Sequence, residues 1–160
     1  MAREMAVQML YQIDMARSEP PEAFAAFDLD EYLRPAEAEP PEREAAPTPC
    51  RSDRQLQEAR LAFEQAQGMV NGTLEHLAEI DDRLRAQAEN WRLERMPPVD
   101  RNILRLALWE MLNESDVPKL VALDEAVELA KRFGAENSGR FVNGLLDALM
   151  RGMNLAESPR

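Results

Sequence analysis

The chain is 160 residues long, which is enough for one domain with a substantial apolar core. Its formal net charge of −11 at pH 7 argues against general nucleic-acid binding, because phosphate contacts require Lys and Arg. The charge is uneven, however: residues 18–54 hold ten acidic residues and four arginines, and they supply −6 of the total. The rest of the chain is only mildly acidic, so net charge alone does not exclude RNA.

The single cysteine, Cys50, excludes an internal disulfide and a cysteine-based metal site. No Gly-rich cofactor loop is found, and we expect neither a cofactor nor a metal. No apolar run approaches the roughly 18 residues of a membrane span. The first residues alternate apolar and polar at helical spacing, which is unlike a signal peptide. These features predict a cytoplasmic protein with no membrane partner.

Residues 2–17 are predicted to form a helix, because one apolar stripe recurs at helical spacing. The helix must end before the prolines at 20 and 21. Residues 18–52 are predicted to be an acidic, Pro-rich insertion, which carries seven of the eleven prolines. One short helix is expected there, containing Phe24, Phe27, Tyr32 and Leu33, followed by a disordered loop from Arg34 to Arg51.

Helical patterns resume at Ser52-Asp53, a capping signal before a long helix that is predicted to reach Leu77. Another helix is expected from Ile80 towards Trp91. Pro97-Pro98 suits the first turn of the next helix, 99–113, whose apolar residues on most sides predict a buried, central position. A further helix is expected over 119–133. Nothing predicts a strand, so the fold class is an all-α bundle of about six or seven helices.

The last two helices, 119–133 and the one containing Phe141 and Leu145, meet at a polar corner. Gly134 is expected to be the left-handed residue that ends the first helix, and Asn137 or Ser138 to cap the second. Gly144 lies inside a helical pattern at a cost of about 1 kcal/mol, so close approach of another helix is expected there. The corner is rich in basic and polar side chains, which favours binding over catalysis: Lys131, Arg132, Asn137, Ser138 and Arg140.

Four stretches of the sequence resemble the NusB family of bacterial transcription antitermination factors. They are AREMAVQMLYQID near the N-terminus, WRLERMPPVDRNILRLALWEML, PKLVALDEAVELAKRF and SGRFVNGLLDAL. The resemblance implies one domain over residues 1–160, built from two packed three-helix bundles. It implies a non-enzymatic factor that binds the boxA element of nascent ribosomal RNA leader transcripts together with NusE, a small-subunit ribosomal protein. This complex helps RNA polymerase, with other Nus factors, to read through terminators and helps ribosomal RNA to mature.

The resemblance also implies where partners bind. RNA contacts would come from Arg3, in an N-terminal arginine arm, and from the corner residues Asn137, Ser138, Arg140 and Phe141. NusE would contact Tyr11 and the start of the buried helix, at Asp100 and Ile103. Family members usually carry several arginines ahead of Arg3, so either the true start lies upstream or RNA affinity is reduced.

Two other functions are therefore kept as alternatives. One is a protein-only scaffold that binds NusE with weak or no RNA binding. The other is an enzyme, because some ribosomal RNA cytosine methyltransferases carry a NusB-like domain ahead of a catalytic one. The chain stops at Arg160 without such a catalytic part, so we expect no enzymatic activity.

Several side chains have two possible roles. Phe141 can stack on an unpaired base or can be the first core residue of its helix. Asn137 can read a base edge or only cap the helix. Arg132 and Arg140 can contact phosphate or remain solvated, with Glu128 a possible partner of Arg132 one helical turn away. The two tryptophans are expected to pack on the bundle, although Trp91, beside Arg92 and Arg95, can instead border a binding surface.

Overall fold

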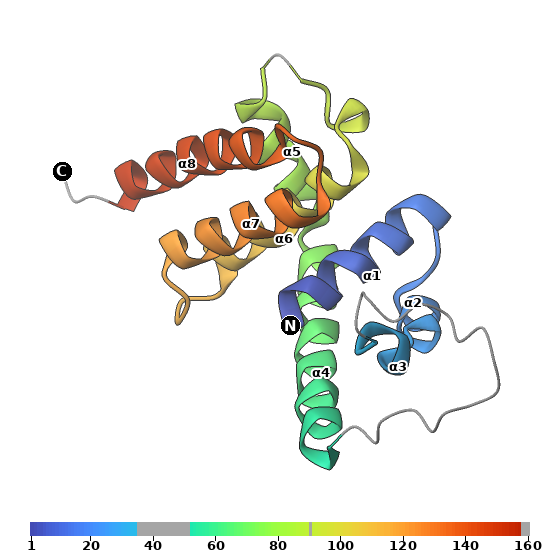
Figure 1. Ribbon diagram of the computed structural model, residues 1–160. Coiled ribbons are helices and arrows are strands. Elements are labelled where there is room, and N and C mark those ends of the chain that lie inside the picture. The colour runs from blue at the N-terminus through green and yellow to red at the C-terminus, as the bar shows by residue number, and fades with distance from the viewer. Residues whose placement is uncertain (35–51, 90, 158–160) are drawn as a thin grey trace.

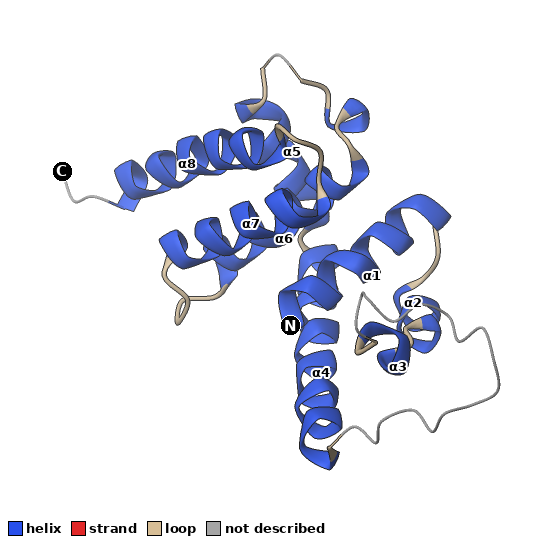
Figure 2. Cartoon of the chain, in the orientation of Figure 1, coloured by secondary structure: helices blue, strands red, loops and turns tan. Residues whose placement is uncertain are grey.

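The computed structural model describes residues 1–34, 52–89 and 91–157 of the chain. Within these ranges every regular element is a helix, which confirms the all-α fold class (Figures 1 and 2). The predicted disordered loop and Cys50 lie outside the described residues, apart from Arg34. The helices are α1 (Ala2–Ala16), α2 (Pro20–Ala26), α3 (Leu29–Tyr32), α4 (Asp53–Glu75), α5 (Leu77–Gln87), the 3-10 helix η1 (Leu93–Arg95), α6 (Pro98–Asn113), α7 (Lys119–Phe133) and α8 (Ser138–Glu157).

The beginning of the acidic insertion forms two short helices, where one was predicted. Glu19 and Glu22 make a capping box that starts α2, so the prolines at 20 and 21 occupy its first turn. Phe27 ends α2 in an extended conformation, and the Asp28 carboxylate accepts N–H groups of α3. The Phe27 ring stacks on Phe63 of α4, 5.2 Å between centroids, which anchors this segment. The expected six or seven helices were therefore too few for the described ranges.

Helix α4 begins where its capping signal predicted. The Ser52 hydroxyl accepts a hydrogen bond from the Gln55 N–H at 3.3 Å. Further along, α4 approaches α6 so closely that a Cβ on Gly72 would lie 2.3 Å from the indole of Trp109. Trp109 is buried, as predicted for a tryptophan packed on the bundle. The glycine therefore permits the contact between α4 and α6.

Helix α6 is the centre of the fold. Eleven of its sixteen residues are buried, which confirms the position predicted from its apolar surface. It packs against α1 and α4 on one side and against α5, α7 and α8 on the other (Figure 1). The molecule therefore consists of two helical units around one shared helix, in keeping with the expected pair of packed bundles. None of the helices in the described ranges is long and apolar enough to cross a membrane.

A polar network joins α1 and α5 to α6 inside the fold. The Asp14 carboxylate accepts hydrogen bonds from Arg101 at 2.6 and 2.9 Å and from Asn102 at 3.1 Å. Arg105 donates to both oxygens of Asp81 at 2.9 and 3.0 Å. Burial raises the pKa of Asp14, but the hydrogen bonds and the charges of Arg101 and Arg105 outweigh it, so the pKa is lowered. The network holds α6 in place against α1 and α5.

Candidate nucleic-acid interface

The turn from α7 to α8 is tight, and Gly134 has a different role from the predicted one. Its backbone is extended (φ −90°, ψ −172°), so the expected left-handed conformation was wrong. A Cβ at this position would lie 2.5 Å from the Cβ and hydroxyl of Ser138 and 2.7 Å from the Ala130 carbonyl oxygen. Close approach of the following helix, rather than a positive φ, therefore requires glycine here.

Replacing Gly134 with alanine tests this explanation. Because the new methyl group would displace Ser138 or the end of α7, we expect the free energy of unfolding to fall by about 1–3 kcal/mol. Gly152→Ala is the matched control, since a Cβ there meets nothing within 4 Å and alanine favours a helix. Chemical denaturation measures both variants. Equal stability of Gly134→Ala and the unmodified chain would contradict the steric explanation.

Ser138 faces the interior and fixes the corner to α6. Its hydroxyl accepts a hydrogen bond from the Ala135 N–H at 2.8 Å and donates one to the Asp100 carboxylate at 3.0 Å. The Ser138 hydroxyl thus bonds to an N–H group in the turn ahead of α8, and not to one of the free N–H groups of α8. Both side chains are buried, and burial raises the pKa of Asp100, an effect that the Ser138 hydrogen bond opposes. Asp100 and Ser138 therefore position the corner from within.

The exposed side chains at the corner are polar and basic. Asn137 and Arg140 are exposed, and the Asn137 carbonyl accepts the Phe141 N–H at 3.1 Å. Arg132 bonds to Glu4 of α1 at 2.9 Å, and not to Glu128, its possible partner one helical turn away, while 65% of the Arg132 side chain remains exposed. The Glu128 carboxylate instead accepts a hydrogen bond from Lys131 Nζ at 3.4 Å. The sequence suggested a partner for Arg132 within its own helix, whereas in the fold the partner comes from α1.

An aromatic pair extends this corner towards α5 and η1. Phe141 is half-buried against the core, and its ring meets Trp91 at 5.8 Å between centroids with 61° between the planes. Trp91 is 57% exposed, so it packs less closely on the bundle than was expected of the two tryptophans. Exposed aromatic rings beside arginines form the kind of surface on which unpaired bases stack.

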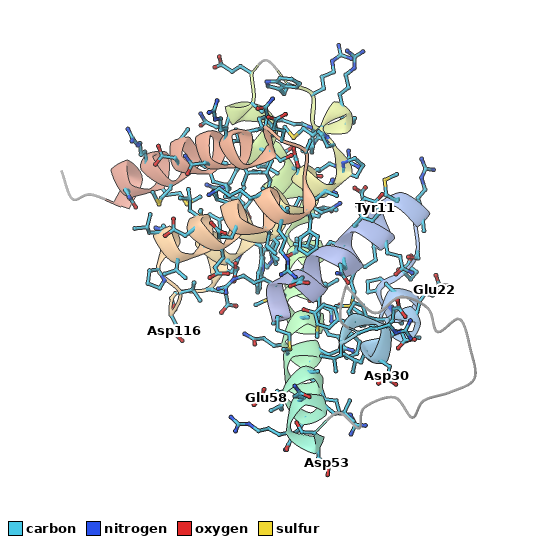
Figure 3. The ribbon with its side chains drawn as sticks, in the orientation of Figure 1. Tyr11, Glu22, Asp30, Asp53, Glu58 and Asp116 are labelled. Carbon is cyan, nitrogen blue, oxygen red and sulfur yellow. The ribbon has the colours of Figure 1, made fainter. Side chains whose placement is uncertain are left out.

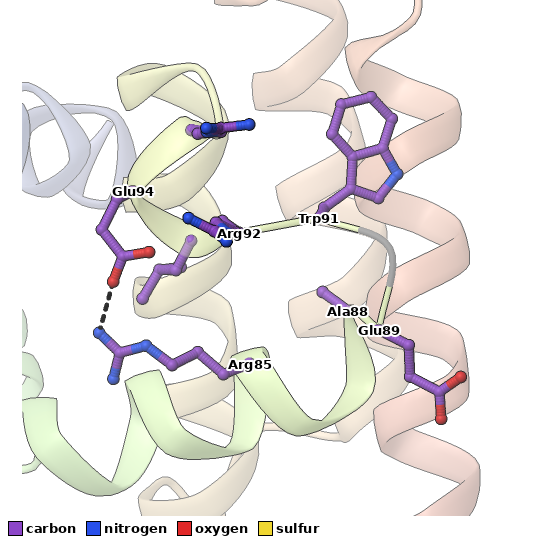
Figure 4. A pocket seen from close by; sticks show the side chains of 8 residues that line it. Arg85, Ala88, Glu89, Trp91, Arg92 and Glu94 are labelled. Atoms are coloured by element: carbon purple, nitrogen blue, oxygen red, sulfur yellow. Dashed lines mark hydrogen bonds and ion pairs between the residues drawn. The ribbon is translucent and has the colours of Figure 1, made fainter.

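Next to Trp91 lies a hollow of about 740 Å³ between α5 and η1. Figure 4 shows Arg85 reaching from α5 to Glu94, where Nη2 lies 3.0 Å from the carboxylate, while Trp91 extends in the other direction, towards α8. Arg92 and Arg95 also line the hollow. A backbone hydrogen bond and, after it, the hydrogen bond from Arg85 lower the pKa of Glu94, which keeps this carboxylate ionised. Arginines thus gather on one side of a chain that is strongly acidic overall.

Apart from Asp100, which bonds to Ser138 at the corner, the remaining predicted contact residues lie elsewhere on α1 and α6. Arg3 donates through Nε to both oxygens of buried Glu110, at 2.9 and 3.1 Å, and so connects α1 to α6. Tyr11, on α1, is 40% exposed (Figure 3). Ile103 is 1% exposed and Asp100 3%. Of the three residues expected to bind a protein partner, only Tyr11 has an accessible side chain, because the others lie on the buried helix α6.

The rest of this surface was only weakly indicated by the sequence. Trp91 was noted beside two arginines, but nothing local indicated that Phe141, 50 positions later, would meet it. Arg85 was not identified from the sequence, because its partner Glu94 lies in η1, beyond the turn that follows α5. The surface formed by Trp91, Phe141 and the neighbouring arginines can bind an anionic polymer whose bases are unstacked. Among the described residues no group of three His, Cys, Asp or Glu side chains could hold a metal ion.

Comparison with known proteins agrees with this geometry. The sequence profile of the NusB family matches residues 1–151. The transcription antitermination protein NusB of Sorangium cellulosum (strain So ce56) is 40% identical over 158 residues, which cover 99% of this chain and 95% of that protein. The protein of the same name from Anaeromyxobacter sp. (strain Fw109-5) is 42% identical over 152 residues, with 95% and 89% covered.

Solved structures are similar as well. One described as T. maritima NusB superposes with a TM-score of 0.69 at 34% identity, covering 94% of this chain and 88% of that one. Another, described as antitermination factors NusB and NusE in complex with dsRNA, has a TM-score of 0.70 at 24% identity and covers 94% of both chains; this likeness shows the fold alone. The profile match and the 40–42% identical relatives together show that the chain belongs to the NusB family.

Proposed function

We propose that this protein is a cytoplasmic transcription antitermination factor that binds boxA-type RNA of nascent ribosomal RNA transcripts together with NusE. It acts within the RNA polymerase antitermination complex and has no enzymatic role of its own. The observation that carries the proposal is the α7–α8 corner, where exposed Arg140 stands beside the half-buried ring of Phe141 and the exposed ring of Trp91. In proteins that bind single-stranded RNA, cationic groups contact the phosphates and aromatic rings stack on the unpaired bases.

The names of the 40–42% identical relatives support the transcriptional role. A solved structure with the same fold is described as NusB and NusE in complex with dsRNA. Arg132, Asn137 and Phe141 are the other RNA contacts that we propose at the corner, with Ser138 acting through the position it gives to α8. Tyr11 is the proposed NusE contact. Arg3 is proposed to serve RNA only indirectly, because its Nε holds Glu110. A protein-only scaffold is the second candidate, and RNA titration separates the two.

Charge reversal at Arg140 is the direct test. We expect Arg140→Glu to weaken binding of a labelled boxA oligoribonucleotide, in the presence of NusE, by about tenfold or more at 0.15 M salt. Losing one phosphate contact should also reduce the slope of log affinity against log salt by nearly one unit. Fluorescence anisotropy across a salt series measures both quantities.

Arg151→Glu is the matched control, since it makes the same charge change on the same helix. Arg151 lies about 16 Å along α8 from Arg140, roughly two screening lengths at physiological salt. Its side chain is 76% exposed and pairs with Asp147 one helical turn away. Equal losses in the two variants would mean that overall charge, and not the corner, controls binding. No RNA binding by the unmodified protein with NusE would favour the scaffold.

A further inference from the structure

A groove of about 350 Å³ runs between the segment ahead of η1 and helix α8. Trp91 borders it on one side, and the α8 residues Arg140, Phe141, Gly144 and Leu145 border it on the other. These α8 positions are spaced so that they share one helix face. The volume falls within the range of small-ligand clefts, roughly 300–1,000 Å³. The groove adjoins the corner but extends beyond the residues that the proposed function uses.

Gly144 lies in the interior of α8 for no reason of packing. Glycine costs a helix interior about 1 kcal/mol relative to alanine. Close approach of another helix was expected to explain it, but that prediction was wrong, because a Cβ at Gly144 would meet nothing within 4 Å. Gly68 and Gly152 are equally open, but neither lines this groove. At Gly144 the missing side chain keeps the floor of the groove empty.

The aromatic wall of the groove is open to a ligand. The rings of Trp91 and Phe141 meet edge to face, so neither covers the other completely. Trp91 retains 57% exposure, although an indole of this size is usually largely buried. Stacking a base on such a ring removes apolar surface from water and tolerates any base, because every base has a π-face.

The charges around the groove match a phosphate chain. Arg140 lines the groove itself, and Arg85, Arg92 and Arg95 line the adjoining hollow. Two carboxylates, at Glu89 and Glu94, offset part of this charge, which leaves +2 on the two linings in a chain of net charge −11. A local excess of arginine on an acidic protein favours an anionic partner at this place.

We propose that the groove is a base-binding subsite, in which an unpaired nucleobase of the bound RNA stacks against Trp91 above Gly144. The phosphates on either side of that base lie towards Arg92 and Arg140. The subsite rests on the proposed RNA binding and adds a second aromatic platform beyond Phe141. Trp91 and Gly144 thereby take part in recognition, one by contact and the other by leaving room.

Substitutions in the full chain test the subsite. With a fluorescein-labelled boxA oligoribonucleotide and NusE, Trp91→Ala should lower affinity about 5- to 150-fold, the range found for losing one stacked base. Trp91→Phe should recover part of that loss. Gly144→Leu fills the groove from an exposed helical position, so affinity should fall while the melting temperature stays the same or rises. Leu61→Ala, at an exposed residue of α4, is the control and should change neither.

Intrinsic fluorescence gives a second readout, because Trp91 is exposed and Trp109 is buried. Adding RNA should quench the indole emission of the unmodified protein and should leave that of Trp91→Phe unchanged. If Arg140→Glu loses affinity while Trp91→Ala and Gly144→Leu keep theirs, the subsite is refuted and the proposed RNA binding stands. If the unmodified protein with NusE binds no RNA, both are refuted.

Discussion

Arg105→Ala should destabilise the fold by about 3–5 kcal/mol, because it leaves a buried carboxylate without its cation. Arg105 donates to both oxygens of Asp81, and both side chains are only 11% exposed. It also lies 3.4 Å from Asp14, so one substitution weakens the junction of α1, α5 and α6. Urea denaturation followed by far-ultraviolet circular dichroism gives the change in the free energy of unfolding.

Two further variants separate this effect from a general loss of charge. Arg83→Ala removes an arginine whose pair with Glu79 is exposed, and it should cost less than 1 kcal/mol. Arg105→Met combined with Asp81→Leu removes both partners, and most of the lost stability should return, since no unpaired charge remains buried. If the double variant were as unstable as Arg105→Ala, lost packing rather than an unpaired carboxylate would be the cause.

Arg3→Ala should cost about 2–3 kcal/mol at pH 7, somewhat less than Arg105→Ala because a quarter of the Arg3 side chain is exposed. The cost arises at Glu110, which is 2% exposed and loses the hydrogen bonds from Arg3. Thermal and urea unfolding measure it. Arg54→Ala, which breaks an exposed pair with Glu58 on α4, is the control and should be nearly neutral.

The cost of Arg3→Ala should depend on pH in a defined direction. Burial raises the pKa of Glu110 above its ordinary value, the Arg3 hydrogen bond and charge lower it, and Glu114 and Glu125 raise it. Removing Arg3 therefore raises the pKa of Glu110 further. A carboxyl group with a raised pKa in the folded state favours folding below its ordinary pKa, 4.5 for Glu110, and loses that contribution as the pH rises through the raised value.

The deficit of Arg3→Ala should accordingly be largest at neutral pH and should shrink as the pH falls towards 4.5. Adding Glu110→Gln should remove the pH dependence and restore most of the stability at pH 7. A deficit that stayed constant between pH 7 and pH 4.5 would show that lost packing, and not the buried carboxylate, is responsible.

The sequence allowed the central helices to be predicted closely, for identifiable reasons. Proline marks the starts of both helices: Pro98 lies in the first turn of α6, where its missing N–H and restricted φ are suited, and Pro118 is the residue just ahead of α7. The apolar residues on most sides of α6 correctly predicted a buried position. The two short helices α2 and α3 were harder to predict, because each is held by caps and by the stacking of Phe27 on Phe63, and short helices have little stability of their own.

The site was only partly predictable, because its contacts join distant parts of the chain. Glu128 was a possible partner of Arg132 within the helix, but the fold brings Arg132 to Glu4, 128 positions away. Gly134 was assigned to a left-handed turn because sequence shows a glycine but not the neighbour that would collide with a side chain. Ile103 was taken from a family resemblance as a partner contact, although the pattern of its own helix had already indicated burial.

The bond between Asp14 and Arg101 spans 87 positions of the chain, which has a consequence during synthesis. A ribosome adds about 5–20 residues per second, so α1 emerges about 4–17 s before the arginine that its aspartate will hold. During that interval the stripe of Met5, Met9 and Leu10 lacks its cover from α6. Until α6 is made, helix α1 can pack only on the elements that precede α6, chiefly α4, so its apolar face is incompletely covered during synthesis.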